Sequence, residues 1–290
     1  MSTAVAVPDP ERVTDACFTD DGTLLAFLYT DGSVRVFQSD EKRVFTQVAE
    51  TPPCCRHAIA LSFASSDLGG IFVIADDSGR TFLYDRVEDD TFTLVITMQP
   101  HKAPINSVAF APTGLSFACG SSDGLLSLTT CDQKAWSWQL SRCSNSPVTS
   151  VSWSPLACMS FVDRPNLDES ARLVAGSSDG FFNIFTVRGI SLVPDGSPVR
   201  AHEGAVYSVA WRPLPGFARW EIASCGADGQ VILWTKEKDW TQQVICSCDE
   251  PPSAVKWSQC GFMLSVSVGQ NVRLFREDSQ HVWTEMRNGA

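Results

Sequence analysis

The sequence predicts an all-β protein, a β-propeller of six repeated units. Three segments show the repeat most clearly: ACGSSDGLLSL at 118–128, VAGSSDGFFNIF at 174–185 and IASCGADGQVILW at 222–234. In each, an apolar strand runs through an Asp-Gly turn into a second apolar strand. Gly accepts the positive φ angle that such a hairpin turn requires, and Asp tolerates it. The hairpin recurs about every 40 to 56 residues, so the chain is predicted to be a string of similar β-sheets.

Aligning the hairpins predicts one domain over residues 1–290, with blades near 13–48, 55–98, 101–140, 145–193, 201–246 and 252–287. Each unit opens with a strand that alternates apolar and polar residues, as half-buried strands do. In five units an aromatic residue stands six positions after the turn, and Thr129 takes that place in the third, whose third strand is therefore expected to pack less tightly. Four strands in each of six units favour a WD-repeat propeller. A β-sandwich is the alternative fold.

Two units contain residues that suit a buried hydrogen-bond network between neighbouring strands. The fifth unit has His202, Ser224, Asp228 and Trp234, and the third has a partial set. Such networks fix packing when every member is satisfied, so we interpret these histidines as structural rather than catalytic. The partial set of the third unit consists of His101, Ser121 and Asp123.

Composition argues against several classes of function. A formal net charge of -11 and a pI near 4.8 disfavour direct binding to nucleic acid or anionic lipid. The N-terminal residues do not read as a secretory signal, and no apolar run reaches the roughly 18 residues of a membrane span. Eleven cysteines then indicate a reducing compartment and thiols that act as small buried hydrophobes. The Cys54-Cys55 and Cys246/Cys248 pairs lack zinc-site spacing, so no metal and no cofactor is predicted.

The two end units are each predicted to hold their full set of strands. No strand from one end of the chain is then left to complete the sheet at the other end and so close the ring of blades. Unit one is predicted to have its own outer strand near Arg43 to Ala49, and unit six near Val282 to Arg287. Residues 4–7 could add a strand, but Pro8 and Pro10 follow at once and proline removes a ladder donor. We therefore expect an open ring that a partner completes with a seventh blade. Direct packing of the first unit against the last is the alternative.

Several segments resemble the SEC13 family of small propellers. The similarity is carried by HKAPINSVAFAPTGLSFACGSSDGLLSL from residue 101, IASCGADGQVILWTKE from residue 222 and NVRLFRE from residue 271, and it is looser before residue 101. The resemblance implies a non-catalytic scaffold whose partner supplies the seventh blade and continues into an α-helical solenoid. In the COPII vesicle coat of ER-to-Golgi transport this partner is SEC31, and in the Y-complex of the nuclear pore it is a scaffold nucleoporin. The implied locations are cytoplasmic, at ER exit sites and at the nuclear pore.

An inserted blade would lie against the flanks of units one and six. The residues predicted to meet it are Phe18, Phe27 and Phe37 on unit one, and Trp257, Phe262, Phe275 and Trp283 on unit six. Each of them could equally belong to ordinary packing between blades.

Other functions remain open at this point. The sister SEH1 family, which serves the nuclear pore and a nutrient-signalling complex, shares the open ring. An adaptor for a ubiquitin ligase commonly carries a Trp-Asp-x-Arg signature, whereas Trp234 and Trp240 are each followed by Thr. An enzyme is disfavoured, because the chain has no phosphate-binding Gly loop, nucleophile elbow or metal-ligand spacing.

Overall fold

The structure is a computed structural model that describes residues 9–87, 91–112, 115–132, 135–155, 171–213, 220–236, 238–278 and 281–286. Strands β1 to β25 and two short 3-10 turns, η1 (Pro10–Arg12) and η2 (Ser66–Leu68), make up the regular structure of this part of the chain. The prediction of an all-β protein is confirmed. Over the same ranges, no helix has the length and apolar character needed to cross a membrane.

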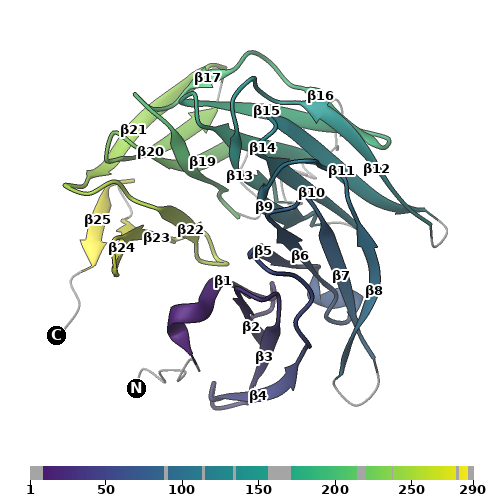
Figure 1. Ribbon diagram of the computed structural model, residues 1–290. Coiled ribbons are helices and arrows are strands. Elements are labelled where there is room, and N and C mark those ends of the chain that lie inside the picture. The colour runs from purple at the N-terminus through teal and green to yellow at the C-terminus, as the bar shows by residue number, and fades with distance from the viewer. Residues whose placement is uncertain are drawn as a thin grey trace, which may run out of the picture. The chain divides into compact units, whose positions relative to one another are not determined.

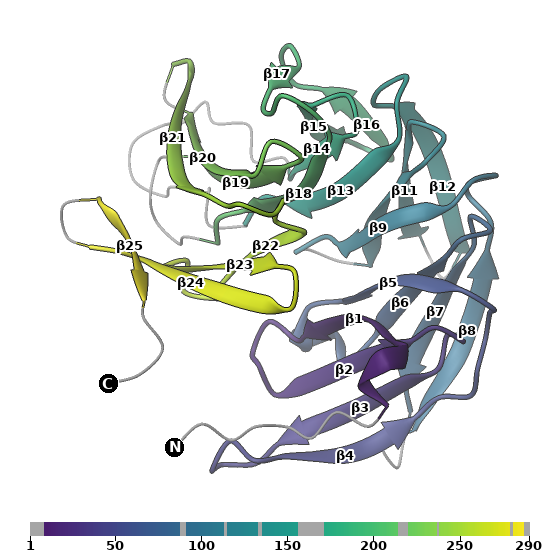
Figure 2. The same cartoon turned by 60° about the vertical axis from the view of Figure 1, so that its left-hand side comes forward.

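The chain divides into two compact units, Met1–Leu140 and Ser141–Ala290. Figures 1 and 2 show the strands of the first unit in purple to teal. They form three antiparallel sheets, each of four strands in chain order. The first blade holds β1 (Val13–Phe18), β2 (Leu24–Tyr29), β3 (Val34–Ser39) and β4 (Phe45–Glu50); the second holds β5 (Ala58–Phe63), β6 (Phe72–Asp76), β7 (Thr81–Arg86) and β8 (Phe92–Met98); the third holds β9 (Ile105–Phe110), β10 (Ser116–Ser121), β11 (Leu125–Asp132) and β12 (Ala135–Arg142).

Three further sheets follow in the second unit, again antiparallel and in chain order. The prediction of six blades is therefore confirmed. The fourth blade holds β13 (Val148–Trp153), β14 (Arg172–Ser177), β15 (Phe181–Arg188) and β16 (Ser191–Pro194), with β17 (Val199–Arg200) also paired to β15; the fifth holds β18 (Val206–Trp211), β19 (Trp220–Gly226), β20 (Gln230–Lys236) and β21 (Trp240–Ser247); the sixth holds β22 (Ala254–Trp257), β23 (Met263–Val268), β24 (Asn271–Glu277) and β25 (Trp283–Met286).

The first and last sheets each use only strands from their own stretch of the chain. β1 to β4 pair with one another, and so do β22 to β25. Within the described residues, neither sheet includes a strand from the other end of the chain. The possible extra strand at 4–7 and the predicted strand end at Arg287 lie outside the described residues.

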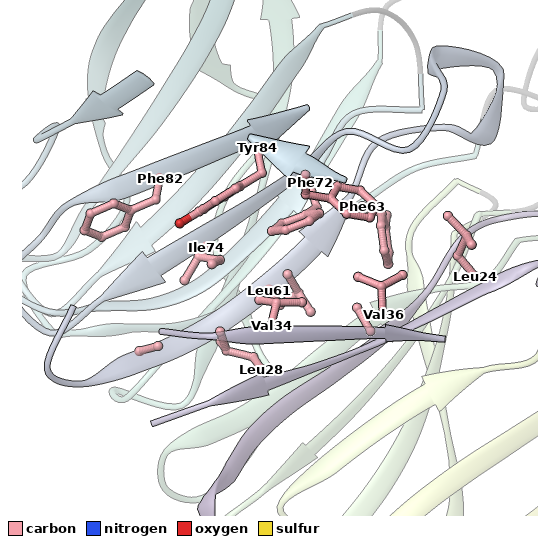
Figure 3. Packing of buried hydrophobic residues seen from close by; sticks show 13 residues of the cluster. Leu24, Leu28, Val34, Val36, Leu61, Phe63, Phe72, Ile74, Phe82 and Tyr84 are labelled. Carbon is pink, nitrogen blue, oxygen red and sulfur yellow. The ribbon is translucent and has the colours of Figure 1, made fainter. Parts of the chain in front are cut away.

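Apolar cores lie between consecutive blades of a unit, because each strand points alternate side chains to opposite faces of its sheet. Figure 3 shows the core between the first two blades, in which Leu24, Leu28 and Val36 face Leu61 and Phe63. Deeper in the second blade, the rings of Phe72 and Tyr84 stack with centroids 5.0 Å apart. The five aromatic residues predicted six positions after the turn are all buried: Phe37, Tyr84, Phe185, Trp234 and Phe275.

The hairpin turn of the second blade shows why glycine follows the turn residue. Gly79 has a φ of +82°, and a Cβ at this position would lie 2.3 Å from the carbonyl oxygen of His101. The turn therefore needs glycine for its backbone angle and for the close approach of the next loop.

Replacing Gly79 with alanine is expected to lower the free energy of unfolding by about 2 to 4 kcal/mol, through strain and collision together. Gly196→Ala is the matched control, because Gly196 has a similar φ of +89° and no heavy atom lies within 4 Å of the point where its Cβ would stand. That control should lose only about 1 to 2 kcal/mol, the cost of the left-handed angle. Urea denaturation of both variants measures the difference, and equal losses would show that the His101 contact contributes nothing.

Candidate functional site

The fifth blade holds a continuous chain of four hydrogen-bonding side chains, of which Trp234, Ser224 and His202 are buried and Asp228 is partly exposed. The Trp234 indole N–H donates to Ser224 Oγ at 2.9 Å, and Ser224 lies 2.8 Å from His202 Nε2. His202 Nδ1 in turn lies 2.9 Å from Asp228 Oδ1. The directions agree if neutral His202 carries its proton on Nδ1, with Ser224 donating to Nε2. Each of the four side chains then has a hydrogen-bond partner.

The electrostatics of this chain suit packing rather than proton transfer. Burial is the largest influence on His202 and lowers its pKa, while Asp228 acts in the opposite direction. Burial alone would raise the pKa of Asp228, but hydrogen bonds from the backbone of Glu203 and Gln230 and from His202 lower it. A neutral imidazole beside an ionised carboxylate is thus the stable state near pH 7. The imidazole of His202 is fully buried, so the chain connects strands and offers no reactive group to solvent.

The third blade holds only the His–Asp half of this chain. His101 Nδ1 lies 3.1 Å from Asp123 Oδ2. Ser121 is predicted to continue the chain, but its hydroxyl donates to the carbonyl of Ala103 at 3.3 Å instead. The strand register explains the difference. Phe117 pairs with Thr129 as Ile222 pairs with Trp234, so Cys119, two residues after Phe117, takes the place of Ser224.

The missing Trp leaves buried polar atoms without partners. Thr129 stands at the place of Trp234, and within the described residues neither its Oγ1 nor His101 Nε2 has a hydrogen-bond partner. The looser third strand expected from this substitution is not seen, because Leu126, Leu128 and Thr129 are almost fully buried. Threonine in place of tryptophan at position 129 therefore leaves the packing of this strand intact and affects its hydrogen bonds.

Replacing Thr129 with valine is expected to raise the free energy of unfolding by about 1 kcal/mol, because an unpaired buried hydroxyl is removed while the shape stays nearly the same. Thr97→Val on β8 is the control, since that threonine is exposed and should change the stability by less than about 0.5 kcal/mol. Chemical denaturation measures both. A clear loss of stability in Thr129→Val would mean that the hydroxyl is satisfied.

Three of the predicted flank residues of the sixth blade pack against the fifth blade. Trp257, Phe275 and Trp283 belong to the core between these two blades, and Trp257 Nε1 donates to the carbonyl of Ala210 at 3.0 Å. This is the ordinary packing that the sequence left open for them. Phe262, the fourth predicted residue, is 53% exposed.

The first blade presents its predicted residues on the face turned away from the second blade. Phe27 and Phe37 meet edge to face with centroids 5.6 Å apart, in a cluster with Leu25 and Tyr29 that includes no residue of the second blade. All four are buried. Phe18, on the edge strand β1, is 54% exposed and packs on Phe45 with ring centroids 5.9 Å apart. Phe18 is therefore the most accessible of the three predicted residues.

The sixth blade has a second face that sequence reasoning did not single out. Leu264 and Phe275 face the fifth blade, so the alternation of side chains places their neighbours in the strand on the opposite side. On this outward face, the cross-strand partners are Met263 and Arg276, Ser265 and Leu274, Ser267 and Val272, and Leu274 and Met286. Val272 is 56% exposed, Met286 42% and Met263 37%. This outward face of the sixth blade is thus a sheet surface with exposed apolar side chains.

A buried arginine in the loop after β18 joins the fifth and sixth blades. Arg212 is 3% exposed and lies 2.6 Å from Glu221, and its guanidinium also bonds Glu277 and the carbonyl of Gly261, the latter at 2.7 Å. Its planar group lies over the rings of two tryptophans, 5.0 Å from the centroid of Trp257 and 5.2 Å from that of Trp283. No local sequence pattern marks this residue, because its partners come from three other segments.

No group of three or more His, Cys, Asp or Glu side chains suited to a metal ion occurs among the residues that the structure describes.

Comparison with known proteins agrees with the repeated fold. Residues 92–128 and 189–235 match the family model of the WD domain, G-beta repeat. The fold is also that of a chain in the crystal structure of a mitotic checkpoint complex, with a TM-score of 0.73 over 93% of this chain and 76% of the other, at 20% identity. Repeats and fold together define a WD-repeat propeller protein.

Its relatives narrow the class. A "Protein SEC13 homolog" of Drosophila melanogaster is 30% identical over 275 residues, covering 90% of this chain and 76% of the relative. A "Protein transport protein sec13" of Emericella nidulans is 26% identical over 300 residues, covering 96% and 95% of the two chains. The chain belongs to the SEC13 family.

Proposed function

We propose that this protein is a non-catalytic scaffold subunit of membrane-coat assemblies, in which an α-solenoid partner completes an open six-bladed ring with a seventh blade. The partner is a SEC31-like protein in the outer coat of COPII vesicles, a scaffold nucleoporin in the Y-complex of the nuclear pore, or both in turn. The name of the Emericella nidulans relative, "Protein transport protein sec13", supports a role in protein transport. The protein is then expected at ER exit sites and at the nuclear pore.

The observation that carries the proposal is the outward face of the sixth blade. A blade in the interior of a unit has apolar cores on both faces, whereas this sheet leaves Val272, Met263 and Met286 substantially exposed. Exposed apolar sheet surface is typical of a site where another protein binds. The sheet already contains its own four strands, so an addition there is a whole blade stacked on its face and not a strand that completes it.

The first blade supports the same arrangement from the other end of the chain. It also contains four strands of its own, and on its face away from the second blade Phe18 is 54% exposed beside a cluster of side chains that is itself buried. An inserted blade would bring its own apolar side chains against both surfaces. Partner binding would then bury area on two blades at once, as stable interfaces require.

Replacing Val272 with aspartate is expected to weaken binding of the inserted segment by about 30-fold, since a buried unpaired carboxylate in an interface costs about 2 kcal/mol or more. Val244→Asp is the matched control, because Val244 is 49% exposed on β21 of the fifth blade and lies away from the proposed interface. The measurement is the affinity for a candidate solenoid partner that carries its insertion segment, by calorimetry after coexpression has established the complex.

Deletion of the insertion segment from the partner should abolish the complex. Two results would refute the proposal of a seventh blade. One is that the deletion leaves binding unchanged, and the other is that Val272→Asp and Val244→Asp weaken binding equally. Copurification with a SEH1-type partner in place of a SEC31-type one would assign the chain to the sister function. Capture of a ubiquitin-ligase subunit would favour the adaptor function.

A further inference from the structure

The loop between β4 and β5 brings two adjacent cysteines together at the junction of the first and second blades. The backbone N–H groups of Cys54 and Cys55 both donate to the carbonyl of Asp31, at 3.2 and 3.3 Å. A Cβ on Gly32 would lie 2.7 Å from the sulfur of each cysteine. The two side chains therefore point to the same place, on the side of Gly32 where a Cβ would stand.

The two thiols have different surroundings. Hydrogen bonds from Cys55 and from the hydroxyl of Tyr84 lower the pKa of Cys54, against the effects of burial and of Asp76. The bond to Cys54, burial and the negative charges of Cys54 and Asp76 raise the pKa of Cys55. In its thiol form Cys54 also donates to the carbonyl of Gly32 at 3.3 Å, a bond that it gives up on ionisation. The pair thus consists of one sulfur suited to be the thiolate and one that keeps its proton.

The pair is accessible to small molecules. Both cysteines are half-buried, and they line a depression of about 620 Å³ together with Arg56, His57, Asp77 and Arg80. Arg80 favours the ionised form of Cys54, because its positive charge lowers the pKa of that thiol. A low-pKa, accessible cysteine beside a second cysteine is the arrangement found in redox-sensing proteins.

The other cysteines in the described part of the chain differ from this pair. Burial raises the pKa of Cys119, Cys143 and Cys225 to about 12, which disfavours their thiolates. Cys246 lies 3.9 Å from Cys248, but its pKa is also raised to about 12. Cys260 is exposed, and hydrogen bonds from Ser258 and from the backbone lower its pKa. The side chain that contacts its sulfur is a serine and not a second cysteine. Among the described cysteines, Cys54 alone combines a stabilised thiolate with an adjacent thiol.

We propose that Cys54 and Cys55 form a peroxide-sensitive redox site, in which Cys54 is oxidised first and Cys55 resolves the product. The Cys54 thiolate attacks one oxygen of hydrogen peroxide, the O–O bond breaks, and the departing hydroxide takes a proton and leaves as water. Cys54 has then become a sulfenic acid. The Cys55 sulfur attacks the Cys54 sulfur, the S–O bond breaks, and a second water leaves with the Cys55 proton. Two thiols are oxidised to one disulfide while one peroxide is reduced to two waters.

The disulfide closes a small ring through the Cys54–Cys55 peptide bond. Such a ring is strained, and strained disulfides are readily reduced, so thiols such as glutathione reverse the oxidation. Closing the ring moves the two N–H groups that bind the Asp31 carbonyl and changes the packing around Gly32. The turn of the first blade, at Asp31 and Gly32, is the element that responds. The redox site does not depend on the proposed scaffold function.

Mass spectrometry of the full chain after treatment with hydrogen peroxide and digestion tests the proposal. The peptide with Cys54 and Cys55 should lose two hydrogens and resist iodoacetamide, and dithiothreitol should restore both thiols. Cys55→Ser should stop at a sulfenic acid on Cys54 that dimedone traps. Cys54→Ser should oxidise more slowly at Cys55, because burial and the negative charge of Asp76 still raise the pKa of the Cys55 thiol in that variant. Cys260 is the internal control, which dimedone should trap without formation of a disulfide within its own peptide.

Two results would overturn the site. One is a Cys54–Cys55 peptide that stays fully alkylatable at peroxide concentrations that oxidise Cys260. The other is sulfenic acid on Cys55 in Cys54→Ser at the rate seen for Cys54 in Cys55→Ser. Circular dichroism of each variant checks that it is folded. Hydrogen exchange at residues 30–34 should rise on oxidation of the wild-type chain and stay unchanged in Cys55→Ser.

Discussion

Replacing Arg212 with methionine is expected to lower the free energy of unfolding by about 3 to 5 kcal/mol, because it leaves two largely buried carboxylates without their cation. Glu221 and Glu277 are 12% and 10% exposed, and both bind the Arg212 guanidinium. Methionine keeps much of the apolar stem between the two tryptophan rings, so the loss reports on charge more than on packing. Denaturant unfolding of the variant measures it.

An exposed ion pair of the sixth blade supplies the control. Arg273 and Glu285 are 30% and 44% exposed, and surface pairs of this kind contribute about 0 to 1 kcal/mol. Arg273→Met should therefore change the stability by about 1 kcal/mol at most. Equal losses in the two variants would contradict the role given to Arg212.

The pH dependence gives a second check on Arg212. Burial alone would raise the pKa of Glu277, but Arg212 and His281 lower it below the ordinary glutamate value of 4.5. A carboxylate with a lowered pKa stabilises the folded state above the unfolded pKa and loses this effect as the pH falls through the folded pKa. The difference between the wild type and Arg212→Met should thus shrink below about pH 4.5. A difference that stays constant down to about pH 3 would indicate that lost packing dominates.

Replacing Trp234 with alanine is expected to lower the free energy of unfolding by about 3 to 5 kcal/mol. The indole is 4% exposed and packs edge to face on Phe182 with ring centroids 5.4 Å apart, so truncation leaves a large cavity. It also removes the donor to Ser224, which ends the hydrogen-bond chain of the fifth blade. Thermal and chemical denaturation measure the effect.

Two companion variants separate these causes. Trp138 on β12 is 40% exposed, and Trp138→Ala should therefore lose less than about 1 kcal/mol. Trp234→Phe keeps most of the ring and removes the N–H, so its expected loss is about 1 to 2 kcal/mol. If Trp138→Ala is as destabilising as Trp234→Ala, burial in the fifth blade is not the reason for the effect.

The number of blades could be predicted from the sequence because it depends on local rules. The Asp-Gly turns between the second and third strands of four blades each form a hairpin, and their glycines, Gly32, Gly124, Gly180 and Gly229, all adopt positive φ angles. The alternating strand that starts each unit is likewise observed, since period-two patterns need no distant partner.

The hydrogen-bond chains are less fully predictable. In the fifth blade, the spacing of His202, Ser224, Asp228 and Trp234 along the sequence predicted one network. The structure shows the hydrogen bonds of that network. In the third blade, serine at position 121 fits the same pattern, yet the register assigns the place to Cys119. A shift of two residues leaves a side chain on the same face of a strand, so alternation cannot separate the two positions.

The sequence by itself determined that this protein is an all-β chain of six WD-type blades, because turns and alternating strands are local in origin. Tertiary structure decided which neighbours each aromatic side chain packs against. Trp257 and Trp283 are plausible binding residues in the sequence, but their rings enclose Arg212, whose carboxylate partners lie 9 and 65 residues away. The convergence of the two cysteines on Gly32 was likewise decided by packing, since the turn and the loop that meet there come from separate segments of the chain.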